Sequence, residues 1–527
     1  MINGNNIIAC KYSEAEASIF NASDPATGEQ LAGSFSAANY LLVDQALMSA
    51  SEAFKTYRTI SAKRRAEFLR AIAYEIILLG DELVNRAMAE SGLTKARLTG
   101  ELGRTTGQLR MFASFLEEGS WVNAVIDKAL PERLPLPRPD IRKMLLPIGP
   151  VVVFGASNFP LAFSVAGGDT ASALASGCPV IVKAHPAHPG TSALVGQAIS
   201  KAAISTGMPD GVFSLLFDNG YTVGAELVKH QQTKAVVFTG SFKGGMALVK
   251  LANERNVPIP VFTEMGSINP VILLPEVLKQ RPEELATKYA ASITLGAGQF
   301  CTNPGLILAV RSPGLDRFIN GLLNSIEAIP SATMLTSGIW ENYTLLSSQA
   351  LAKPGLDLIG RSALLNSENV NQAVATVAKV SATIFMSDPK LSEEIFGPWS
   401  LVVECDDVAQ LQRVIESLEG QLTATVMAEK EELPGYSSLL DALTYITGRI
   451  ILNGVPTGVE VCAAMQHGGP FPATSDSRFT SVGTAAVYRF LRPVAWQDWD
   501  DSLLPPELQE SNPLNIWRQV NNNWTKE

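Results

Sequence analysis

The chain has 527 residues, of which 46% are hydrophobic and 41 are glycine, and its formal net charge is −10 at pH 7. This length exceeds what one hydrophobic core usually supports, so we expect two or three domains of a globular protein and not a disordered chain. The acidic balance and the lack of a Lys/Arg cluster exclude nucleic acid as an expected partner.

The amino terminus has no charged segment followed by a long apolar run, and no stretch reaches about 18 uninterrupted apolar residues. We therefore expect a cytoplasmic protein without a membrane span. The five scattered cysteines predict neither a disulfide framework nor a CxxC metal site. His185 and His188 lie three residues apart, but no Cys or carboxylate is near them in the sequence, so no metal site is expected.

Apolar residues at three- and four-residue spacing predict helices from about residue 38 to residue 130. Arg104 and Arg110 fall in one of these helices. The following segment, residues 131–139, is dense in proline and cannot continue a helix. It predicts a linker or an extended arm.

Short apolar runs then alternate with longer segments rich in Ala, Leu and Val. The runs are residues 151–154, 180–182, 212–216 and 235–238, and helices are expected between them, for example over 162–175 and 192–205. Continuous apolar strands with intervening helices predict a parallel sheet covered on both faces. Ligands bind beyond the carboxyl ends of such strands. A second alternating stretch spans residues 269–461, and the chain after Gly483 predicts a docking tail.

Polar residues follow three of the predicted strands. Lys183 ends the second run, and Gly240 and Ser241 follow the fourth, where they would open a helix whose N-terminus attracts phosphate. Asn158 follows the first run, as either a simple turn residue or an amide donor to an oxyanion. No GxGxxG pattern follows the first run, so an ordinary Rossmann dehydrogenase is not supported.

Cys301 lies in the sequence GQFCTNP, among glycines and polar residues that predict an accessible turn, whereas the other four cysteines are expected to be small buried hydrophobes. A thiol with an ordinary pKa of about 8.5 needs a proton acceptor to attack at neutral pH. Glu264, at a predicted strand end, can accept that proton and later activate water, although a carboxylate there can also cap a helix. The pair predicts an enzyme that forms and hydrolyses a thioester.

In their order along the chain, these motifs resemble the aldehyde dehydrogenase family over nearly the whole sequence. The matching positions are Asn158-Phe159-Pro160, Lys183, Phe238-Thr239-Gly240-Ser241, Glu264-Met265-Gly266, Gly298-Gln299-Phe300-Cys301 and Glu394-Ile395-Phe396-Gly397-Pro398. The resemblance implies an α/β fold with two doubly wound parallel-sheet domains and a small β oligomerisation arm. It also implies a homodimer or homotetramer.

The resemblance implies the following domain boundaries. Residues 1–130 and 147–268 would form an NAD(P)-binding Rossmann-like domain, and residues 269–465 the catalytic domain with the nucleophilic cysteine. Residues 131–146 and 483–527 would form the oligomerisation arm and the C-terminal tail.

The family's roles carry over to the matching positions. Cys301 is implied as the nucleophile, Glu264 as the general base and Asn158 as the oxyanion donor. The implied cofactor residues are Lys183 and Glu394 for ribose hydroxyls, Gly240, Ser241 and Gly245 for the pyrophosphate, Phe396 beside the nicotinamide ribose, and His185.

The cofactor is expected to be NADP, with NAD as the alternative. Many NAD-preferring relatives have a glutamate three residues after the strand-end lysine, where it would repel a 2′-phosphate. Here that position is Pro186. Phe242 also departs from the family, which usually has a small threonine there.

Residues 155–164, 183–192 and 467–476 resemble the branch of the family that contains α-ketoglutaric semialdehyde dehydrogenases. This implies oxidation of that semialdehyde to 2-oxoglutarate. The same branch contains bacterial long-chain fatty aldehyde dehydrogenases, which are the alternative. A CoA-acylating semialdehyde dehydrogenase and a catalytically silent binding protein are the two other competing interpretations.

The two substrates make different demands on the site. A dicarboxylic semialdehyde needs a cation for its distal carboxylate, and the candidates are Arg104, Arg110 and Arg478, each of which can equally be a surface or structural arginine. A fatty aldehyde needs an apolar tunnel, for which Ala162 and Ala166, one turn apart on the predicted helix, leave room. Phe159 and His467 complete the candidate substrate residues.

Overall fold

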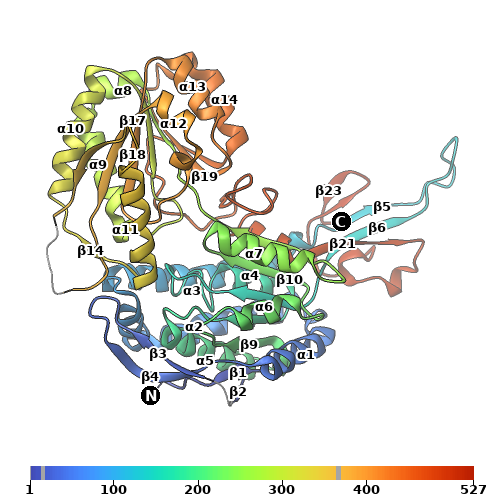
Figure 1. Cartoon of the computed structure of the whole chain (residues 1–527). Coiled ribbons are helices and arrows are strands. Elements are labelled where there is room, and N and C mark those ends of the chain that lie inside the picture. The colour runs from blue at the N-terminus through green and yellow to red at the C-terminus, as the bar shows by residue number, and fades with distance from the viewer. Residues whose placement is uncertain (1, 14–17, 364–368) are drawn as a thin grey trace.

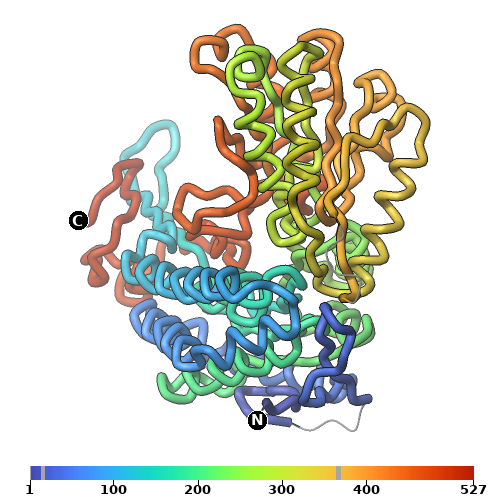
Figure 2. The backbone as a smooth tube through the Cα atoms, turned by 90° about the vertical axis from the view of Figure 1, so that its left-hand side faces the viewer, coloured from blue at the N-terminus to red at the C-terminus, as the bar shows by residue number. Residues whose placement is uncertain are grey.

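The structure is a computed structural model that describes residues 2–13, 18–363 and 369–527. Two α/β bodies lie one above the other, and a thinner sheet projects to one side (Figure 1). The chain builds most of the lower body first and then the upper one, as the colour gradient shows (Figure 2). The α/β architecture with two parallel sheets and a small β arm is therefore confirmed.

The sheet of the first body has the order β11-β10-β7-β8-β9-β1-β2. Its members are β1 (Asn6–Ile8), β2 (Lys11–Ser13), β7 (Val151–Phe154), β8 (Val180–Lys183), β9 (Phe213–Leu216), β10 (Ala235–Thr239) and β11 (Val261–Glu264). The strands from β7 to β11 pair in parallel, and β1 and β2 add an antiparallel edge. The four apolar runs are thus strands of one sheet. Pairing of Thr239 with Glu264 aligns the carboxyl ends of β10 and β11.

Helices cover this sheet on both faces. They are α1 (Tyr40–Tyr57), α2 (Ala62–Ser91), α3 (Lys95–Glu118), α4 (Gly168–Ser176), α5 (Pro189–Ser205), α6 (Thr222–Lys229) and α7 (Phe242–Asn253). The predicted helical stretch before residue 130 is confirmed as α1, α2 and α3. Two hydrophobic clusters, one on each side of the sheet, bury the alternate side chains of the strands.

The helix predicted over residues 162–175 is wrong at its start, because α4 begins only at Gly168. Residues 161–167 form turns, in which the Gly168 N–H donates to the Ala162 carbonyl. The N–H groups of Leu161 and Ala162 donate to the Glu101 carboxylate. These donors are satisfied outside a helix, so Ala162 and Ala166 are not one helical turn apart.

The sheet of the second body has the order β15-β17-β18-β13-β12-β19-β20. Its strands are β12 (Val271–Leu273), β13 (Leu306–Val310), β15 (Asp357–Arg361), β17 (Thr376–Ser381), β18 (Trp399–Cys405), β19 (Gln421–Met427) and β20 (Thr447–Leu452). All pairs are parallel except that of β15 with β17. The flanking helices are α8 (Pro275–Gln280), α9 (Pro282–Thr294), α10 (Pro313–Glu327), α11 (Ser337–Leu351), α12 (Ala382–Ser387), α13 (Val408–Glu416) and α14 (Ser437–Ile446).

Short elements lie between and within these larger units. Two-stranded sheets are formed by β3 (Ile19–Ser23) with β4 (Gln30–Ser36), and by β14 (Ala332–Thr333) with β16 (Gln372–Ala373). The 3₁₀ helices are Ser120–Val122, Asp210–Val212, Leu295–Gly298, Pro389–Ser392, Leu433–Tyr436, Thr484–Phe490, Asp501–Leu503 and Pro506–Leu508.

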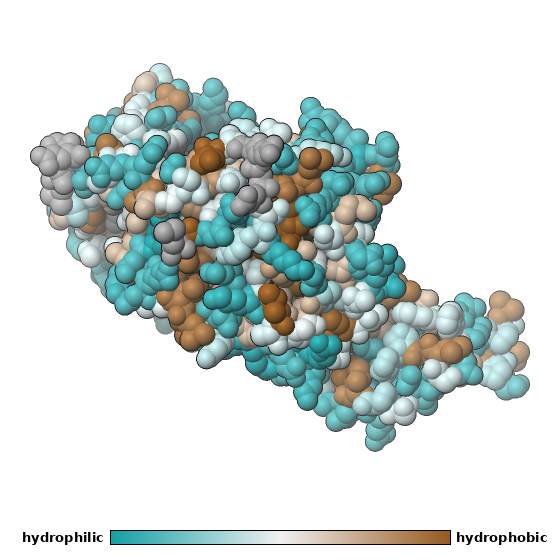
Figure 3. Space-filling model, turned by 90° about the horizontal axis from the view of Figure 1, so that it is seen from below, coloured by the Kyte–Doolittle hydropathy of each residue, from teal (hydrophilic) through white to brown (hydrophobic). Residues whose placement is uncertain are grey.

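The projecting arm is a five-stranded sheet of order β21-β6-β5-β22-β23. It consists of β5 (Val125–Asp127), β6 (Ile141–Pro147), β21 (Leu491–Gln497), β22 (Arg518–Val520) and β23 (Asn523–Thr525). The proline-dense segment leads into β6, and the chain after Gly483 supplies β21, β22 and β23. Hydrophobic side chains lie exposed among hydrophilic ones on this arm (Figure 3). Within the described ranges, no helix has the length and apolar composition to cross a membrane.

Candidate active site

Glu264, Cys301 and His467 converge between the two bodies. Glu264 ends β11, Cys301 lies in the loop before β13, and His467 lies in the segment between β20 and β21. The Nε2 atom of His467 is 3.4 Å from the Cys301 Sγ and 3.1 Å from the Glu264 Oε1. One ligand atom from each residue lies within 4.8 Å of the other two. We call these three residues the thiol cluster.

Glu264 is held as a carboxylate within this cluster. Its side chain is 4% exposed, and its Oε2 accepts a hydrogen bond of 2.6 Å from the Ser481 hydroxyl. Burial alone would raise the pKa of Glu264, but the nearby His467 and the hydrogen bonds from His467 and Ser481 outweigh it, so the pKa is lowered. The residue is suited to accept a proton at neutral pH.

Cys301 is held as a thiol. Burial raises its pKa well above the ordinary value, and the charge of Glu264 raises it further, while Arg104 acts in the opposite direction. Cys301 would therefore need a neighbouring base to lose its proton before it could act as a nucleophile.

The loop before Cys301 has an unusual backbone. Gly296, Ala297 and Gly298 have φ values of 56°, 56° and 66°. A Cβ on Gly298 would lie 2.3 Å from the Gly397 carbonyl, so only glycine fits there. The loop is thereby pressed against the segment that carries Glu394 and Phe396.

Asn269 anchors the same loop, and the sequence did not identify it as a candidate. Its Nδ2 donates to the carbonyl oxygens of Cys301 and Asn303, at 2.9 Å each. Asn269 is fully buried, with a φ of 47°. The carbonyls that it binds in this loop lie more than thirty residues away along the chain, so no local signal in the sequence marks this contact.

Asn158 lies beside the nucleophile loop, as expected. Its side-chain Nδ2 donates to the Gln299 carbonyl at 3.1 Å, and its own carbonyl accepts from Arg97 at 3.2 Å. The side-chain amide of Asn158 therefore contacts the loop at Gln299, two residues before Cys301.

Arg104 is the arginine candidate that faces the site. Its guanidinium carbon lies 5.7 Å from the Phe159 ring centroid and 5.1 Å from that of Phe163. Its Nε and Nη2 atoms are buried without a hydrogen-bond partner among the described residues. Arg110 is exposed on the same helix, and Arg478 is 79% exposed and paired with Asp476. The structure does not bring these two into the site.

Two further arginines, Arg97 and Arg449, lie near Cys301 and were not identified from the sequence. Burial lowers the pKa of Arg97 and of Arg449, and the charge of Cys301 acts on both in the opposite direction. Arg97 is paired with Glu101 at 3.6 Å, and the Nη atoms of Arg449 donate to the carbonyls of Pro456 and Gly458. Sequence alone could not distinguish them from other surface arginines.

Glu394 and Phe396 line a pocket beside the nucleophile loop, together with Gly298 and Phe300. Burial raises the pKa of Glu394 to about 7. A Cβ on Gly266 would lie 2.4 Å from the Glu394 Oε2. The glycine of the Glu264-Met265-Gly266 motif therefore makes room for the Glu394 carboxylate.

Ser241 caps the N-terminus of α7, where its Oγ accepts from the Gly244 N–H at 3.2 Å. A Cβ on Gly245 would lie 2.7 Å from the Met265 sulfur, and one on Gly240 would lie 2.6 Å from the Phe238 ring. These glycines allow the strand-to-helix turn to lie close to β10 and β11. Phe242 packs its ring against Phe471, 5.9 Å between centroids, and leaves Ser241 exposed.

Lys183 and His185 lie at the carboxyl end of β8. The Lys183 Nζ donates to the Asp218 carbonyl at 3.0 Å, and burial lowers its pKa to about 8. The rings of His185 and His188 stack at 5.5 Å. His185 Nδ1 accepts from the Ala187 N–H, and His188 Nε2 contacts the Ala156 carbonyl at 2.8 Å. These ring nitrogens bind the backbone and do not converge on a common point.

Known proteins resemble this chain over its full length. Residues 12–469 match the sequence profile of the Aldehyde dehydrogenase family. The chain is 52% identical to α-ketoglutaric semialdehyde dehydrogenase 2 of Azospirillum brasilense over 518 residues, which cover 98% of both chains. It is 49% identical to the α-ketoglutaric semialdehyde dehydrogenase of Acinetobacter baylyi over 488 residues, 92% of both chains.

Solved structures share the fold at low sequence identity. Betaine aldehyde dehydrogenase of Staphylococcus aureus superposes with a TM-score of 0.81 at 18% identity, covering 94% of this chain and 95% of that one. For 3,6-anhydro-L-galactose dehydrogenase the TM-score is 0.80 at 21% identity, with 94% and 99% covered. From the profile match and the full-length relatives, this chain belongs to the aldehyde dehydrogenase family.

Proposed function

We propose that this aldehyde dehydrogenase oxidises α-ketoglutaric semialdehyde to 2-oxoglutarate, with NADP as its preferred cofactor. The observation that carries the substrate proposal is that the Nε and Nη2 atoms of Arg104 are buried beside Phe159 and Phe163 with no hydrogen-bond partner among the described residues. A buried charge without a partner is costly, and a substrate carboxylate offers the two acceptors that a guanidinium lacks here. The names of the two relatives at 52% and 49% identity support the same substrate.

A long-chain aldehyde fits this environment less well. Its aliphatic tail would leave the Arg104 guanidinium unpaired in an apolar setting. Ala162, which could have opened a tunnel from a helix, is instead buried in turns within a cluster of Phe159, Phe163, Phe300 and Val482. The dicarboxylic semialdehyde is therefore the better match.

In the proposed reaction, the Cys301 thiol transfers its proton toward Glu264, and the thiolate attacks the aldehyde carbon. Asn158 and the backbone N–H of Cys301 stabilise the oxyanion of the thiohemiacetal. NADP, held by the residues at the strand ends, would supply the hydride acceptor for this oxidation, and loss of the hydride would leave a thioester on Cys301. Glu264 first releases the thiol proton to solvent and then takes a proton from the water that attacks the thioester. Cleavage of the C–S bond releases the carboxylic acid, which ionises in solvent, and Glu264 returns its proton to the Cys301 sulfur.

His467 acts in this proposal as a positioning residue. Its Nε2 lies between the thiol and the Glu264 Oε1, at 3.4 and 3.1 Å. Together with Ser481, which binds Oε2, it keeps the carboxylate turned toward Cys301. The base therefore has one oxygen held by the protein and one beside the nucleophile.

The residues at the strand ends fit a dinucleotide. Ser241 is exposed at the N-terminus of α7, and Gly240 and Gly245 let this turn pack closely against Phe238 and Met265. Lys183 and Glu394 would hold ribose hydroxyls, and Phe396 would lie beside the nicotinamide ribose. Pro186, near His185, carries no charge that would oppose the 2′-phosphate of NADP.

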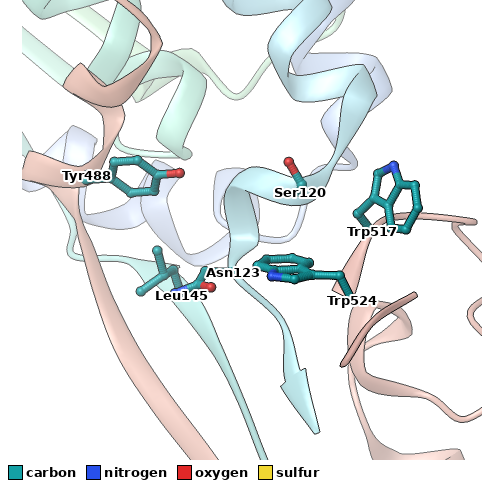
Figure 4. A pocket seen from close by; sticks show the side chains of 6 residues that line it. All are labelled: Ser120, Asn123, Leu145, Tyr488, Trp517 and Trp524. Carbon is teal, nitrogen blue, oxygen red and sulfur yellow. The ribbon is translucent and has the colours of Figure 1, made fainter. Parts of the chain in front are cut away.

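The arm supports a proposal about assembly. Trp517 and Trp524 are 45% and 58% exposed, and they line a pocket on the arm with Ser120, Asn123, Leu145 and Tyr488 (Figure 4). Leu134 and Leu136, in the loop that leads to β6, are 89% and 70% exposed. We infer that a second copy of the chain covers these side chains in a homodimer or homotetramer.

The substrate proposal is tested with a panel of α-ketoglutaric semialdehyde, succinic semialdehyde, glutaraldehyde and decanal, each with NADP and with NAD and without CoA. Reduced cofactor and free acid are measured. We expect the highest kcat/KM for α-ketoglutaric semialdehyde with NADP. A preference for decanal would favour the fatty aldehyde alternative, and a requirement for CoA would favour the acylating one.

Arg104→Met is expected to lower the kcat/KM ratio of α-ketoglutaric semialdehyde to decanal by roughly 100-fold, because two charged hydrogen bonds contribute about 1.5–3 kcal/mol each. Any effect of Arg104 on the Cys301 thiol acts on both substrates and therefore cancels in this ratio. Arg110→Met, which removes an exposed arginine of the same helix, is the matched control. An unchanged ratio in Arg104→Met would remove Arg104 from substrate recognition.

A further inference from the structure

The thiol cluster has the donor set of a transition-metal site. Glu264, Cys301 and His467 offer one oxygen, one sulfur and one nitrogen atom within 4.8 Å of one another. Three protein ligands that leave a fourth position open are typical of exchangeable zinc sites in enzymes. We propose that this cluster binds Zn²⁺ reversibly, and that the bound ion inhibits aldehyde oxidation by occupying the Cys301 sulfur.

Two of the three distances between the donors are close to those of tetrahedral coordination, and the third, between the Cys301 Sγ and the Glu264 oxygen, is at most 4.8 Å. Zinc binds sulfur at about 2.3 Å, nitrogen at about 2.0–2.1 Å and carboxylate oxygen at about 2.0–2.2 Å, so adjacent donors lie about 3.3–3.6 Å apart. In the structure, His467 Nε2 is 3.4 Å from the Cys301 Sγ and 3.1 Å from the Glu264 Oε1. An ion among the three atoms therefore needs only small side-chain shifts.

The charges of the cluster also fit a divalent cation. Binding releases the Cys301 proton to solvent, so that a thiolate and a carboxylate together neutralise the two positive charges of the ion. A neutral complex is suited to this buried position, where His467 and Glu264 are 1% and 4% exposed. The Ser481 hydroxyl already holds the other Glu264 oxygen, whereas Oε1 contacts His467 Nε2 at 3.1 Å and is available to the ion when that contact is exchanged for coordination.

One feature of His467 makes the ion exchangeable. In resident metal sites the second ring nitrogen of a ligating histidine nearly always donates to a carboxylate, carbonyl or water. The Nδ1 of His467 is buried and has no hydrogen-bond partner within the described part of the chain. The imidazole therefore lacks the outer support of a permanent site, and Zn²⁺ acts as an inhibitor and not as a cofactor.

The binding test uses Co²⁺ as a spectroscopic probe on the full chain, freed of metal with a chelator and without substrate or cofactor. We expect one Co²⁺ per chain, with a near-ultraviolet thiolate-to-cobalt band that Zn²⁺ displaces. Cys301→Ser is expected to lose the band. His467→Gln is expected to weaken binding at least about 100-fold, since loss of an outer-shell partner alone costs about 10–100-fold. Cys462→Ser, which removes an exposed cysteine, is the matched control and should keep the band.

A second measurement needs no variant. Zn²⁺ is expected to protect Cys301 from alkylation by iodoacetamide in the wild-type protein, as read by mass spectrometry, while Cys462 stays reactive. A chelator should restore both alkylation of Cys301 and aldehyde oxidation.

Absence of the cobalt band, equal binding by Cys301→Ser, or alkylation of Cys301 that Zn²⁺ does not slow would each overturn the proposal. Because neither binding measurement contains an aldehyde, their outcome is independent of which substrate the enzyme oxidises.

Discussion

At the scale of single residues, the reactivity of Cys301 depends on its neighbours and not on the thiol alone. Burial and the charge of Glu264 both raise its pKa, and Arg104 lowers it. Glu264 therefore has two opposing effects: it is placed to accept the proton, and its charge disfavours the thiolate that results. This balance favours the protonated thiol of Cys301.

Glu264→Gln separates the two effects. The substitution removes a negative charge beside the sulfur, so the pKa of Cys301 is expected to fall and the pH profile of its alkylation to move toward lower pH. Turnover should fall because the proposed base for thioester hydrolysis is lost. The measurement is the rate of iodoacetamide alkylation of Cys301 as a function of pH in both proteins. A profile that stays in place or moves to higher pH would contradict this electrostatic account.

Pro186 offers a single-residue test of the cofactor proposal. Pro186→Glu places a carboxylate where it would face the 2′-phosphate of NADP, and a like-charge contact costs several kcal/mol. The kcat/KM for NADP is expected to fall at least about tenfold relative to that for NAD, which corresponds to about 1.4 kcal/mol. Pro186→Gln, without the charge, is the control. If both variants change the ratio equally, the charge is not responsible.

At the scale of elements, the loop before β13 is shaped by contacts with distant segments. Gly298 lies against Gly397, and Asn269 binds the carbonyls of Cys301 and of Asn303. Such a loop holds its left-handed residues only because the surrounding structure imposes them.

Substitutions of Asn269 test how much this anchoring contributes to stability and turnover. Asn269→Gly removes both hydrogen bonds but accepts the φ of 47°, whereas Asn269→Ala removes them and adds backbone strain. Each buried acceptor left unpaired costs about 1–3 kcal/mol, so both variants should unfold at lower temperature and turn over more slowly, Asn269→Ala more strongly. Thermal unfolding and single-turnover kinetics measure this. Wild-type turnover in Asn269→Gly would show that the loop needs no anchor.

Local sequence patterns were sufficient to predict some of the elements but not all of them. The strands β7, β8, β9 and β10 could be predicted because buried parallel strands are continuous apolar runs. The start of α4 could not be predicted in this way. Glu101, on a distant helix, accepts hydrogen bonds from the N–H groups of residues 161 and 162 and holds them in turns. Periodicity does not reveal a competing acceptor sixty residues away.

At the scale of the whole molecule, the arm is the part that we propose a second copy of the chain covers. Its exposed aromatic residues, Trp517 and Trp524, contribute nothing to the core of the isolated chain.

Trp517→Ser/Trp524→Ser is expected to shift the protein to smaller assemblies, because each aromatic side chain that loses its burial forfeits about 25 cal/mol per Å² of apolar area. Light scattering coupled to size exclusion measures the mass of the assembly. Tyr221→Ser, which removes an exposed aromatic residue from the first body, serves as the comparison. A monomeric wild-type protein would contradict the assembly proposal outright.

The sequence by itself determined the parallel-sheet architecture and the identity of Cys301, Glu264 and Asn158 as candidates. Strand patterns and glycine-rich turns are local properties, so they can be recognised without knowing how the chain closes. The tertiary structure decided which arginine faces the site, that Asn269 anchors the nucleophile loop, and that His467 joins the thiol and the carboxylate. Those relationships join residues far apart in sequence, and only the packing of the two bodies and the segment before β21 brings them within bonding distance.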